Sequence, residues 1–281
     1  MTELNPGRDA LMRLSPAGGV RLAGIDLSQP LSSDQKDAIV AAFVAHQVVV
    51  FPEQSLSREQ QFAFAANFGE VEAHGAHRPA DKAGGKAGDK RYAVAHVMTN
   101  LDADGNPTVR LSPAANYHWH TDKPYRARPP LMTLLHAVEL PPRGGDTEFA
   151  NTALAYESLP DETRRRIAGL RAVFRPAFDP SGACADHPLV RTHPDTGRKS
   201  LYLGNHATHI LGMAQAEGAA LLGELLHHAT QRDFVYVHRW RIGDLIMWDN
   251  RCLLHRAVAN YDVLRDRRIM HRSVVRGTAP F

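Results

Sequence analysis

The sequence predicts a β-rich α+β fold, a sandwich or jelly roll with helices at its edges. Most of its apolar segments are short and are separated by turn-forming residues, which is typical of strands. Helical spacing occurs in only a few segments, and these do not alternate regularly with the strands as a βαβ fold would require. The nucleotide loops GxGxxG and Walker A and the serine-hydrolase motif GxSxG do not occur.

A helix followed by a buried strand is predicted near the N-terminus. Ser32 or Ser33 can cap this helix. Its apolar side chains recur at helical spacing, at Ile39, Val40, Phe43 and Val44. Residues 48–51, Val-Val-Val-Phe, form a continuous apolar run that is expected of a buried strand, and Pro52 ends it.

Three further helices are predicted. Ser57 and Gln60 fit a capping box that begins a helix, and Gly69 is placed to stop this helix after Phe68. Residues 160–170 and 216–231 also have helical character. The second of these carries leucines on one face, at Leu221, Leu222, Leu225 and Leu226.

The other elements are predicted to be strands and one long loop. The strands cover 131–138, 147–149, 245–248 and 273–276, with a turn at 143–146. The segment near 73–91 predicts a mobile active-site loop, because its second half is rich in Gly and Lys and lacks large apolar residues. A loop without a function remains an alternative. Strand-like sequence resumes at Tyr92, so this segment is no domain linker, and we predict a single domain over 1–281.

Composition and charge narrow the class of protein. The 281 residues are 43% hydrophobic and 22% charged, a balance typical of globular domains. The formal net charge of +3 argues against nucleic acid as a partner, which normally requires a clustered basic face. The N-terminus lacks the apolar core of a signal peptide, and the apolar stretch 38–51 is too short to span a membrane. Two cysteines without a CxxC motif favour reduced thiols and a cytoplasmic location.

The segment from Asn116 to Asp122 carries the main functional signal. If this segment is a strand, His118, His120 and Asp122 point to one face. An imidazole and a carboxylate two residues apart can bind one metal, and a third ligand from elsewhere would complete a 2-His-1-carboxylate face with open positions. His118 is an alternative to His120 as a metal ligand, but we expect it to lie beside the metal site or at the rim of the pocket. The second His-x-Asp, His193–Asp195, is rejected because a proline and a turn interrupt strand alternation there.

His255 is the candidate for the distant ligand. It follows a predicted strand, a polar turn at 249–251 and an apolar pair, which suggests that it points into a protected site. On this evidence alone, the alternative that His255 is an ordinary core histidine remains open. Arg268 and Arg272 lie four apart and share a face if the segment is extended. Two arginine forks could bind two carboxylates, those of a keto-acid co-substrate and of an acidic substrate, whereas the alternative is a solvated basic strand.

These pieces, in this order, resemble the taurine/2,4-dichlorophenoxyacetate family of 2-oxoglutarate dioxygenases over nearly the whole chain. The segments that carry the resemblance are 48–52, 68–70, 119–122, 144–147, 190–193, 197–199, 248–251 and 268–272. The resemblance implies a double-stranded β-helix (jelly roll) core with flanking helices. It also implies Fe(II), with 2-oxoglutarate and O2 as co-substrates, and a homo-oligomer.

The resemblance also implies roles for individual residues. His120, Asp122 and His255 match the iron ligands, while Thr147 and Arg268 match the residues that hold the far carboxylate of 2-oxoglutarate. Three positions match the pocket for a small anionic substrate: Arg272, which would pair with its acidic group, Asn116, and more loosely His74. The implied reaction is hydroxylation of that substrate, with release of succinate and CO2.

The substrate class is less sharply indicated. Residues 198–209 and 228–236 are more similar to the phenoxyacetate enzymes, which implies an aryloxyalkanoate or related carboxylate and oxidative ether cleavage. Residues 268–272 are more similar to the taurine enzymes, so a sulfonate is the alternative. A zinc-dependent hydrolase with the same three ligands and a non-catalytic metal-binding module remain rival hypotheses.

Overall fold

The computed structural model describes residues 11–72, 95–108, 116–176 and 182–281. The helices are α1 (Ser33–His46), α2 (Arg58–Ala66), α3 (Thr152–Glu157), α4 (Asp161–Ile167) and α5 (Gln215–Ala229), with a 3-10 turn at Arg232–Phe234. The strands are β1 (Leu11–Ser15), β2 (Gly18–Leu22), β3 (Val48–Phe51), β4 (His96–Thr99), β5 (Pro130–Glu139), β6 (Thr147–Asn151), β7 (Arg171–Phe174), β8 (Ala185–Pro188), β9 (Val190–Thr192), β10 (Lys199–Leu201), β11 (Ala207–Ile210), β12 (Val235–His238), β13 (Leu245–Asp249), β14 (Leu253–Ala257) and β15 (Ile269–Arg276). The β-rich α+β class predicted from the sequence is confirmed.

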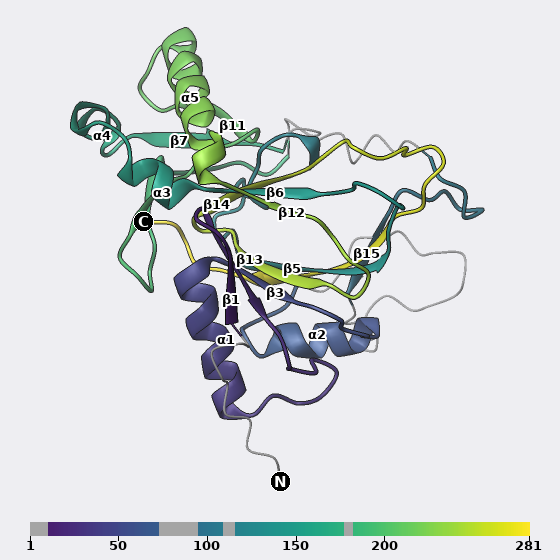
Figure 1. The fold of residues 1–281 in the computed structure, drawn as a ribbon. Coiled ribbons are helices and arrows are strands. Elements are labelled where there is room, and N and C mark those ends of the chain that lie inside the picture. Colours follow the sequence, from purple (N-terminus) through teal and green to yellow (C-terminus); the bar gives the residue numbers. More distant parts are fainter. Residues whose placement is uncertain (1–10, 73–94, 109–115, 177–181) are drawn as a thin grey trace.

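Two sheets face each other at the centre of the molecule (Figure 1). Within the described residues, the larger sheet has seven strands in the order β1-β2-β3-β13-β5-β15-β4. Its neighbours are antiparallel except for the parallel pair β2 and β3. The smaller sheet has the order β12-β6-β14. The metal-binding candidates described below lie on and beside β14, so this pairing of sheets positions the site.

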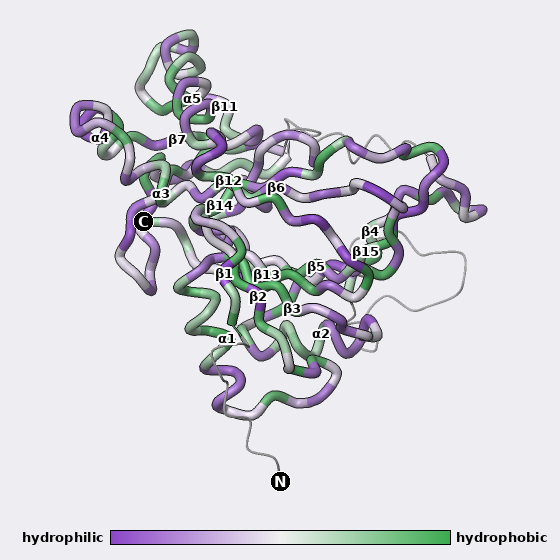
Figure 2. Tube along the Cα trace, viewed as in Figure 1, coloured by the Kyte–Doolittle hydropathy of each residue, from purple (hydrophilic) through white to green (hydrophobic). Residues whose placement is uncertain are grey.

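The hydrophobic core is divided by the larger sheet. On one side, helices α1 and α2 cover the sheet around Phe43, Phe51 and Phe64. On the other side, Phe149 and Trp248 pack between the two sheets. The tube in Figure 2 is most hydrophobic along the central strands β3, β13 and β5, as expected for strands buried on both faces. A third cluster packs α5 and α3 around Leu221 and Leu225.

The local start signals of the helices are confirmed. Ser32 with Gln35 and Ser57 with Gln60 each form a complete capping box. The ends of the helices differ by a few residues from the predictions, since α2 ends at Ala66 and α4 at Ile167. None of the helices in the described ranges is both long enough and apolar enough to cross a membrane.

Candidate metal centre

Three buried side chains come together between the two sheets. One ligand atom each from His120, Asp122 and His255 lies within 4.8 Å of the others. Each of the three residues is 7% exposed, and His255 Nε2 lies 3.9 Å from Asp122 Oδ1. Two imidazoles and one carboxylate, shielded from bulk water, fit a ferrous ion and leave room for further ligands. The structure therefore brings together the three residues that the sequence analysis selected.

Main-chain pairing produces this meeting. The amide of His120 donates to the carbonyl of His255 at 3.1 Å, and the amide of His255 donates back at 2.8 Å. His255 belongs to β14, whereas His120 forms an isolated bridge beside it. The predicted strand around 116–122 is wrong, because residues 116–117 form a 3-10 turn. The side-chain alternation that suggested the site is therefore not what builds it.

His118 contributes its backbone rather than its side chain. Its side chain is exposed, whereas its carbonyl oxygen lies 2.8 Å from Nδ1 of His120. A carbonyl can only accept, so Nδ1 of His120 carries the proton and Nε2 keeps a free lone pair for a metal.

The backbone of Gly204 packs closely against the backbone of His120. A Cβ atom at position 204 would lie 3.2 Å from the His120 Cα. Gly204 has φ +124°, and both features favour glycine at this position.

The electrostatics keep these three side chains in protonation states that can bind a metal. Burial lowers the pKa of His120 and lowers that of His255 further, so both imidazoles stay neutral. Burial alone would raise the pKa of Asp122, but the guanidinium of Arg272 and the hydrogen bond from Thr133 hold it well below its usual range. Arg272 Nη2 lies 2.5 Å from Asp122 Oδ1. Asp122 is thus an ionised carboxylate in a buried site.

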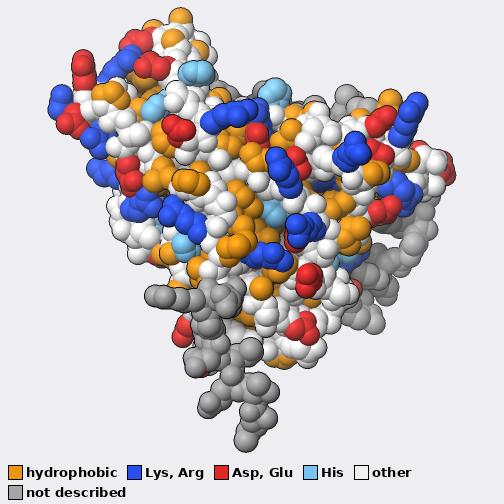
Figure 3. Space-filling model, viewed as in Figure 1, with side chains coloured by type: hydrophobic (Ala, Val, Ile, Leu, Met, Phe, Trp, Pro, Cys, Tyr) orange, Lys and Arg blue, Asp and Glu red, His pale blue; other side chains and the backbone are white. Residues whose placement is uncertain are grey.

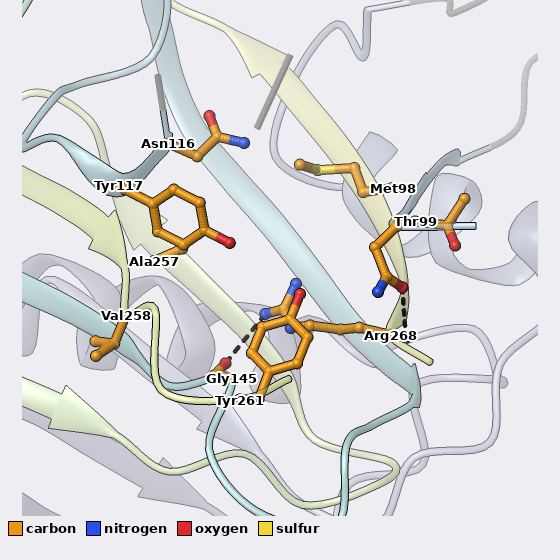
Figure 4. Close-up of a pocket in the computed structure, with 10 residues that line it drawn as sticks. Met98, Thr99, Asn116, Tyr117, Gly145, Ala257, Val258, Tyr261 and Arg268 are labelled. Atoms are coloured by element: carbon orange, nitrogen blue, oxygen red, sulfur yellow. Dashed lines mark hydrogen bonds between the residues drawn. The ribbon is translucent and has the colours of Figure 1, made fainter. Parts of the chain in front are cut away.

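A pocket lined by Ala257, on the same strand as His255, surrounds Arg268. Figure 4 shows Asn116, Tyr117 and Tyr261 around the space that this arginine enters. The Nη2 of Arg268 donates to the carbonyl of Gly145 at 3.3 Å. Its buried Nε has no hydrogen-bond partner within the described part of the chain. A buried guanidinium donor without an acceptor fits the carboxylate of a ligand.

Thr147 lies near this pocket but does not line it. Its hydroxyl oxygen accepts a hydrogen bond from Trp240 Nε1 at 3.0 Å. Because the indole N–H only donates, the hydroxyl hydrogen of Thr147 is free for another acceptor. Asn116 does line the pocket. His74 and the predicted active-site loop near 73–91 lie outside the described residues.

His193, Asp249 and Cys252 form a second group of potential ligands, in which His193 and Asp249 already have protein partners. Arg251 donates to both carboxylate oxygens of Asp249, and His193 Nε2 donates to Asp249 at 3.0 Å. Asp195 pairs with Arg251 at 2.8 Å. The rejection of His193–Asp195 as a ligand pair for the metal centre agrees with this arrangement, in which His193 pairs with the buried Asp249 and the half-exposed Asp195 pairs with Arg251.

A different pocket opens between the β1–β2 hairpin and β12. Arg21, Arg239 and Arg241 line it together with apolar side chains such as Met12. Figure 3 shows how Lys and Arg side chains surround a hydrophobic area on this face. Of the predicted site residues that the structure describes, none lines this pocket.

Sequence reasoning missed several polar side chains around the site. Thr133 lies in the apolar run of β5, and Asn250 lies in a turn after β13. Thr133 donates a hydrogen bond to Asp122, and Asn250 donates one to Thr133. His206 packs edge-on against the ring of His120, with centroids 6.2 Å apart. Tyr117 belongs to the same segment as His120, whereas Tyr261 comes from a separate one. No local pattern marks Thr133 or Tyr261, because only the tertiary fold brings them to the site.

Comparisons with known proteins connect this geometry to a family. The family described as "Taurine catabolism dioxygenase TauD, TfdA family" matches residues 12–274. The alpha-ketoglutarate-dependent 2,4-dichlorophenoxyacetate dioxygenase of Cupriavidus pinatubonensis is 38% identical over 273 residues, 89% of this chain and 92% of that protein. The (S)-phenoxypropionate/alpha-ketoglutarate-dioxygenase of Sphingobium herbicidovorans is 32% identical over 280 residues, 91% of this chain and 89% of that protein. The crystal structure of AAD-2 with Mn(II) and N-oxalylglycine has a TM-score of 0.83 at 35% identity, covering 96% of this chain and 99% of that one.

Proposed function

Since the chain belongs to the TauD/TfdA family of 2-oxoglutarate-dependent dioxygenases, we propose that it hydroxylates a small aryloxyalkanoate or related carboxylate and so cleaves its ether bond. The observation that carries the reaction class is the buried set of His120, Asp122 and His255. The substrate class is supported by the similarity to the phenoxyacetate and phenoxypropionate enzymes.

The proposal assigns a role to each side chain of the site. His120, Asp122 and His255 would hold Fe(II) through two neutral nitrogens and one carboxylate oxygen. Arg268, whose Nε lacks a partner among the described residues, would bind the far carboxylate of 2-oxoglutarate. Thr147 would donate its free hydroxyl hydrogen to that carboxylate. Bidentate pairing by the guanidinium fixes the orientation of the co-substrate as well as its affinity.

Arg272 would bind the acidic group of the substrate. It lies at the metal centre, in contact with Asp122, and only 16% of its side chain is exposed. Asn116 would contribute to the same pocket, as the sequence resemblance implies, and so would His74. With the acidic group of the substrate bound to Arg272, the carbon next to that group would be the part of the substrate nearest the metal.

Bound Fe(II) supplies the activation of O2, which is coupled to decarboxylation of 2-oxoglutarate to succinate and CO2. The buried walls of the site exclude water from this chemistry. Hydroxylation of the carbon between an ether oxygen and a carboxylate gives a hemiacetal. The hemiacetal breaks at the bond to the ether oxygen, which leaves as a phenol, and the former substrate carbon becomes the carbonyl of a keto or aldehyde acid.

A sulfonate is the second candidate substrate. The similarity of residues 268–272 to the taurine enzymes favours it, because Arg272 would bind a sulfonate as readily as a carboxylate. Hydroxylation beside the sulfur would release sulfite and an aldehyde.

Further proposals concern the architecture and setting of the enzyme. We propose that the facing sheets form a double-stranded β-helix, or jelly roll, within a single domain over 1–281, and that the enzyme is a homo-oligomer. Support for the first comes from the face-to-face sheets around one core cluster. We also propose a cytoplasmic location, supported by two free cysteines, Cys184 and Cys252.

The test is anaerobic loading with Fe(II) and 2-oxoglutarate, followed by O2 and a panel of substrates. The panel contains an aryloxyacetate, an aryloxypropionate, an aliphatic carboxylate and taurine, with succinate and phenol or sulfite as readouts. We expect succinate and phenol in equal amounts from the aryloxyalkanoates and no turnover by the Zn(II)-loaded protein. Hydrolysis with Zn(II) and without O2 would support a zinc hydrolase instead, whereas 2-oxoglutarate binding without turnover would indicate a binding module.

A further inference from the structure

The two oxygens of Asp122 have different surroundings. Oδ1 faces the two histidines, 3.9 Å from His255 Nε2, and pairs with Arg272 Nη2 at 2.5 Å. Oδ2 accepts a hydrogen bond from the hydroxyl of Thr133 at 2.5 Å. Thr133 is completely buried and lies in the middle of β5, between Trp248 on β13 and Val274 on β15. Its position is therefore set by two strand pairings.

The direction of this hydrogen bond is fixed by its neighbours. Trp248 Nε1 donates to Asn250 Oδ1 at 3.1 Å. An indole N–H can only donate, so the amide oxygen of Asn250 must face Trp248 and its Nδ2 must face Thr133. Asn250 Nδ2 then donates to the Thr133 hydroxyl at 3.0 Å. The single hydrogen of that hydroxyl is left for Asp122.

Asn250 is itself held in place from several sides. Its backbone amide donates to the carbonyl of Leu131 at 3.0 Å, and its carbonyl accepts from the hydroxyl of Thr121 at 2.9 Å. Asn250 is completely buried. Trp248, Asn250, Thr133 and Asp122 thus form one chain of directed hydrogen bonds that ends at Oδ2.

From this geometry, and resting on the proposed function of the site, we propose that Thr133 is a positioning residue that makes Asp122 a one-oxygen metal ligand. Thr133 holds Oδ2 toward β5, whereas Oδ1 faces the two histidines and would bind the metal beside its ion pair with Arg272. A carboxylate that used both oxygens would take one more coordination position, and a position needed for co-substrate or O2 would be lost. Thr133 therefore protects the open half of the coordination sphere without touching the substrate.

The matched variants are Thr133→Val, which replaces the hydroxyl with a methyl group of similar size, and Thr133→Ser, which keeps it. The metal probe is Mn(II), and the readout is the number of exchangeable waters on bound Mn(II) from water-proton relaxation. We expect about three waters in the unmodified protein and in Thr133→Ser, and about two in Thr133→Val, because a 2-His-1-carboxylate face leaves three of six positions open. We also expect weaker N-oxalylglycine binding to Mn(II)-loaded Thr133→Val, since this analogue needs two open positions.

An unchanged or larger number of waters in Thr133→Val would overturn the proposal. If the thermal transition shows that Thr133→Val does not fold, Thr133→Ala is used instead, because it removes the same hydroxyl without adding bulk. We expect about two waters on Mn(II) in that variant as well. Failure of the proposed function has a different signature: the unmodified protein would then not form succinate with Fe(II), whatever the hydration of its Thr133 variants.

Discussion

Arg272 Nη2 lies 2.5 Å from Oδ1 of Asp122, the carboxylate oxygen that faces the two histidines. The guanidinium proposed to bind the substrate's acid thus contacts a proposed metal ligand directly. The positive charge of Arg272 is the largest of the effects that lower the pKa of Asp122 against the opposing effect of burial. If Arg272 binds the substrate as proposed, one ion pair connects substrate recognition with the charge of the candidate metal site.

Replacing Arg272 should separate these two roles. In Arg272→Ala we expect kcat/KM for an acidic substrate to fall by roughly 10² to 10³, because loss of one partner of a shielded charge pair costs about 2–5 kcal/mol. Mn(II) affinity should change by less than about tenfold, because the three ligands remain. Arg272→Lys, which keeps the charge but not the fork, should lie between. Equal losses of substrate turnover and metal affinity would contradict the assigned role.

Arg268 should govern the affinity for 2-oxoglutarate. Arg268→Ala is expected to raise the KM for 2-oxoglutarate by roughly 10² because charge-assisted hydrogen bonds contribute about 1.5–3 kcal/mol each. Thr147→Val should raise it by roughly fivefold, since a neutral hydroxyl contributes about 1 kcal/mol. Steady-state kinetics at saturating substrate give both values. An unchanged KM for 2-oxoglutarate in Arg268→Ala would place the far carboxylate elsewhere.

Gly144 is expected to be essential for the shape of the Arg268 pocket. It has φ +75°, and a Cβ at this position would lie 2.1 Å from the carbonyl oxygen of Asn260. Asn260 in turn accepts a hydrogen bond from the amide of Gly145 at 2.7 Å. We expect Gly144→Ala to lower the free energy of unfolding by about 2–4 kcal/mol, measured by denaturant titration, and to raise the KM for 2-oxoglutarate.

The control for this substitution is Gly223→Ala. Gly223 lies on the exposed face of α5, and the space around its Cβ position is open. Alanine there should leave stability unchanged or raise it by up to about 1 kcal/mol, because alanine favours the helix. A Gly144→Ala protein as stable as Gly223→Ala would show that the Asn260 contact is not rigid.

The ion-pair network of Asp249, His193 and Arg251 should make the free energy of unfolding depend on pH in the acidic range. Burial alone would raise the pKa of Asp249, but hydrogen bonds from His193 and Arg251 lower it to about 2. A lowered pKa in the folded state stabilises the fold in full above the unfolded value of about 4, and this contribution is lost as the pH falls through about 2. This lowered pKa contributes about 2 kcal/mol to the free energy of unfolding at neutral pH.

Unfolding titrations at several pH values test this expectation. Asp249→Asn should lower stability at pH 7 by about 3–5 kcal/mol, because Arg251 loses its buried partner, and should show a weaker pH dependence between 2 and 4. The control is Asp195→Asn, whose side chain is half-exposed and should matter little. A wild-type pH profile in Asp249→Asn would mean that another group causes the acid sensitivity.

The sequence allowed prediction of elements that depend on neighbouring residues. The two capping boxes and the all-apolar strand β3 occur where their patterns indicate, because a helix cap needs only residues three apart. The order of strands in the larger sheet was not predictable, because it results from pairings such as that of β3 with β13 between distant segments. Each of these pairings depends on the whole core rather than on any local pattern.

The candidate metal centre was predicted for partly wrong reasons. His120 and Asp122 were selected from their spacing on an assumed strand, but the segment before them is a 3-10 turn. His255 gained weight only from the resemblance to a family. Thr133 could not be predicted, since one threonine in an apolar strand has no distinguishing sequence feature, and its role depends on a turn more than a hundred positions away.

The reciprocal hydrogen bonds between the backbones of His120 and His255 tie together two segments that are far apart in the chain. The entropy lost in closing that long loop is incurred when the sheets assemble, not when an ion arrives. Metal affinity can then reflect the chemistry of the donor atoms almost alone. An ion would meet a preorganised chelator, so selection among divalent cations should follow ligand preference and cellular supply more than any cost of rearranging the protein.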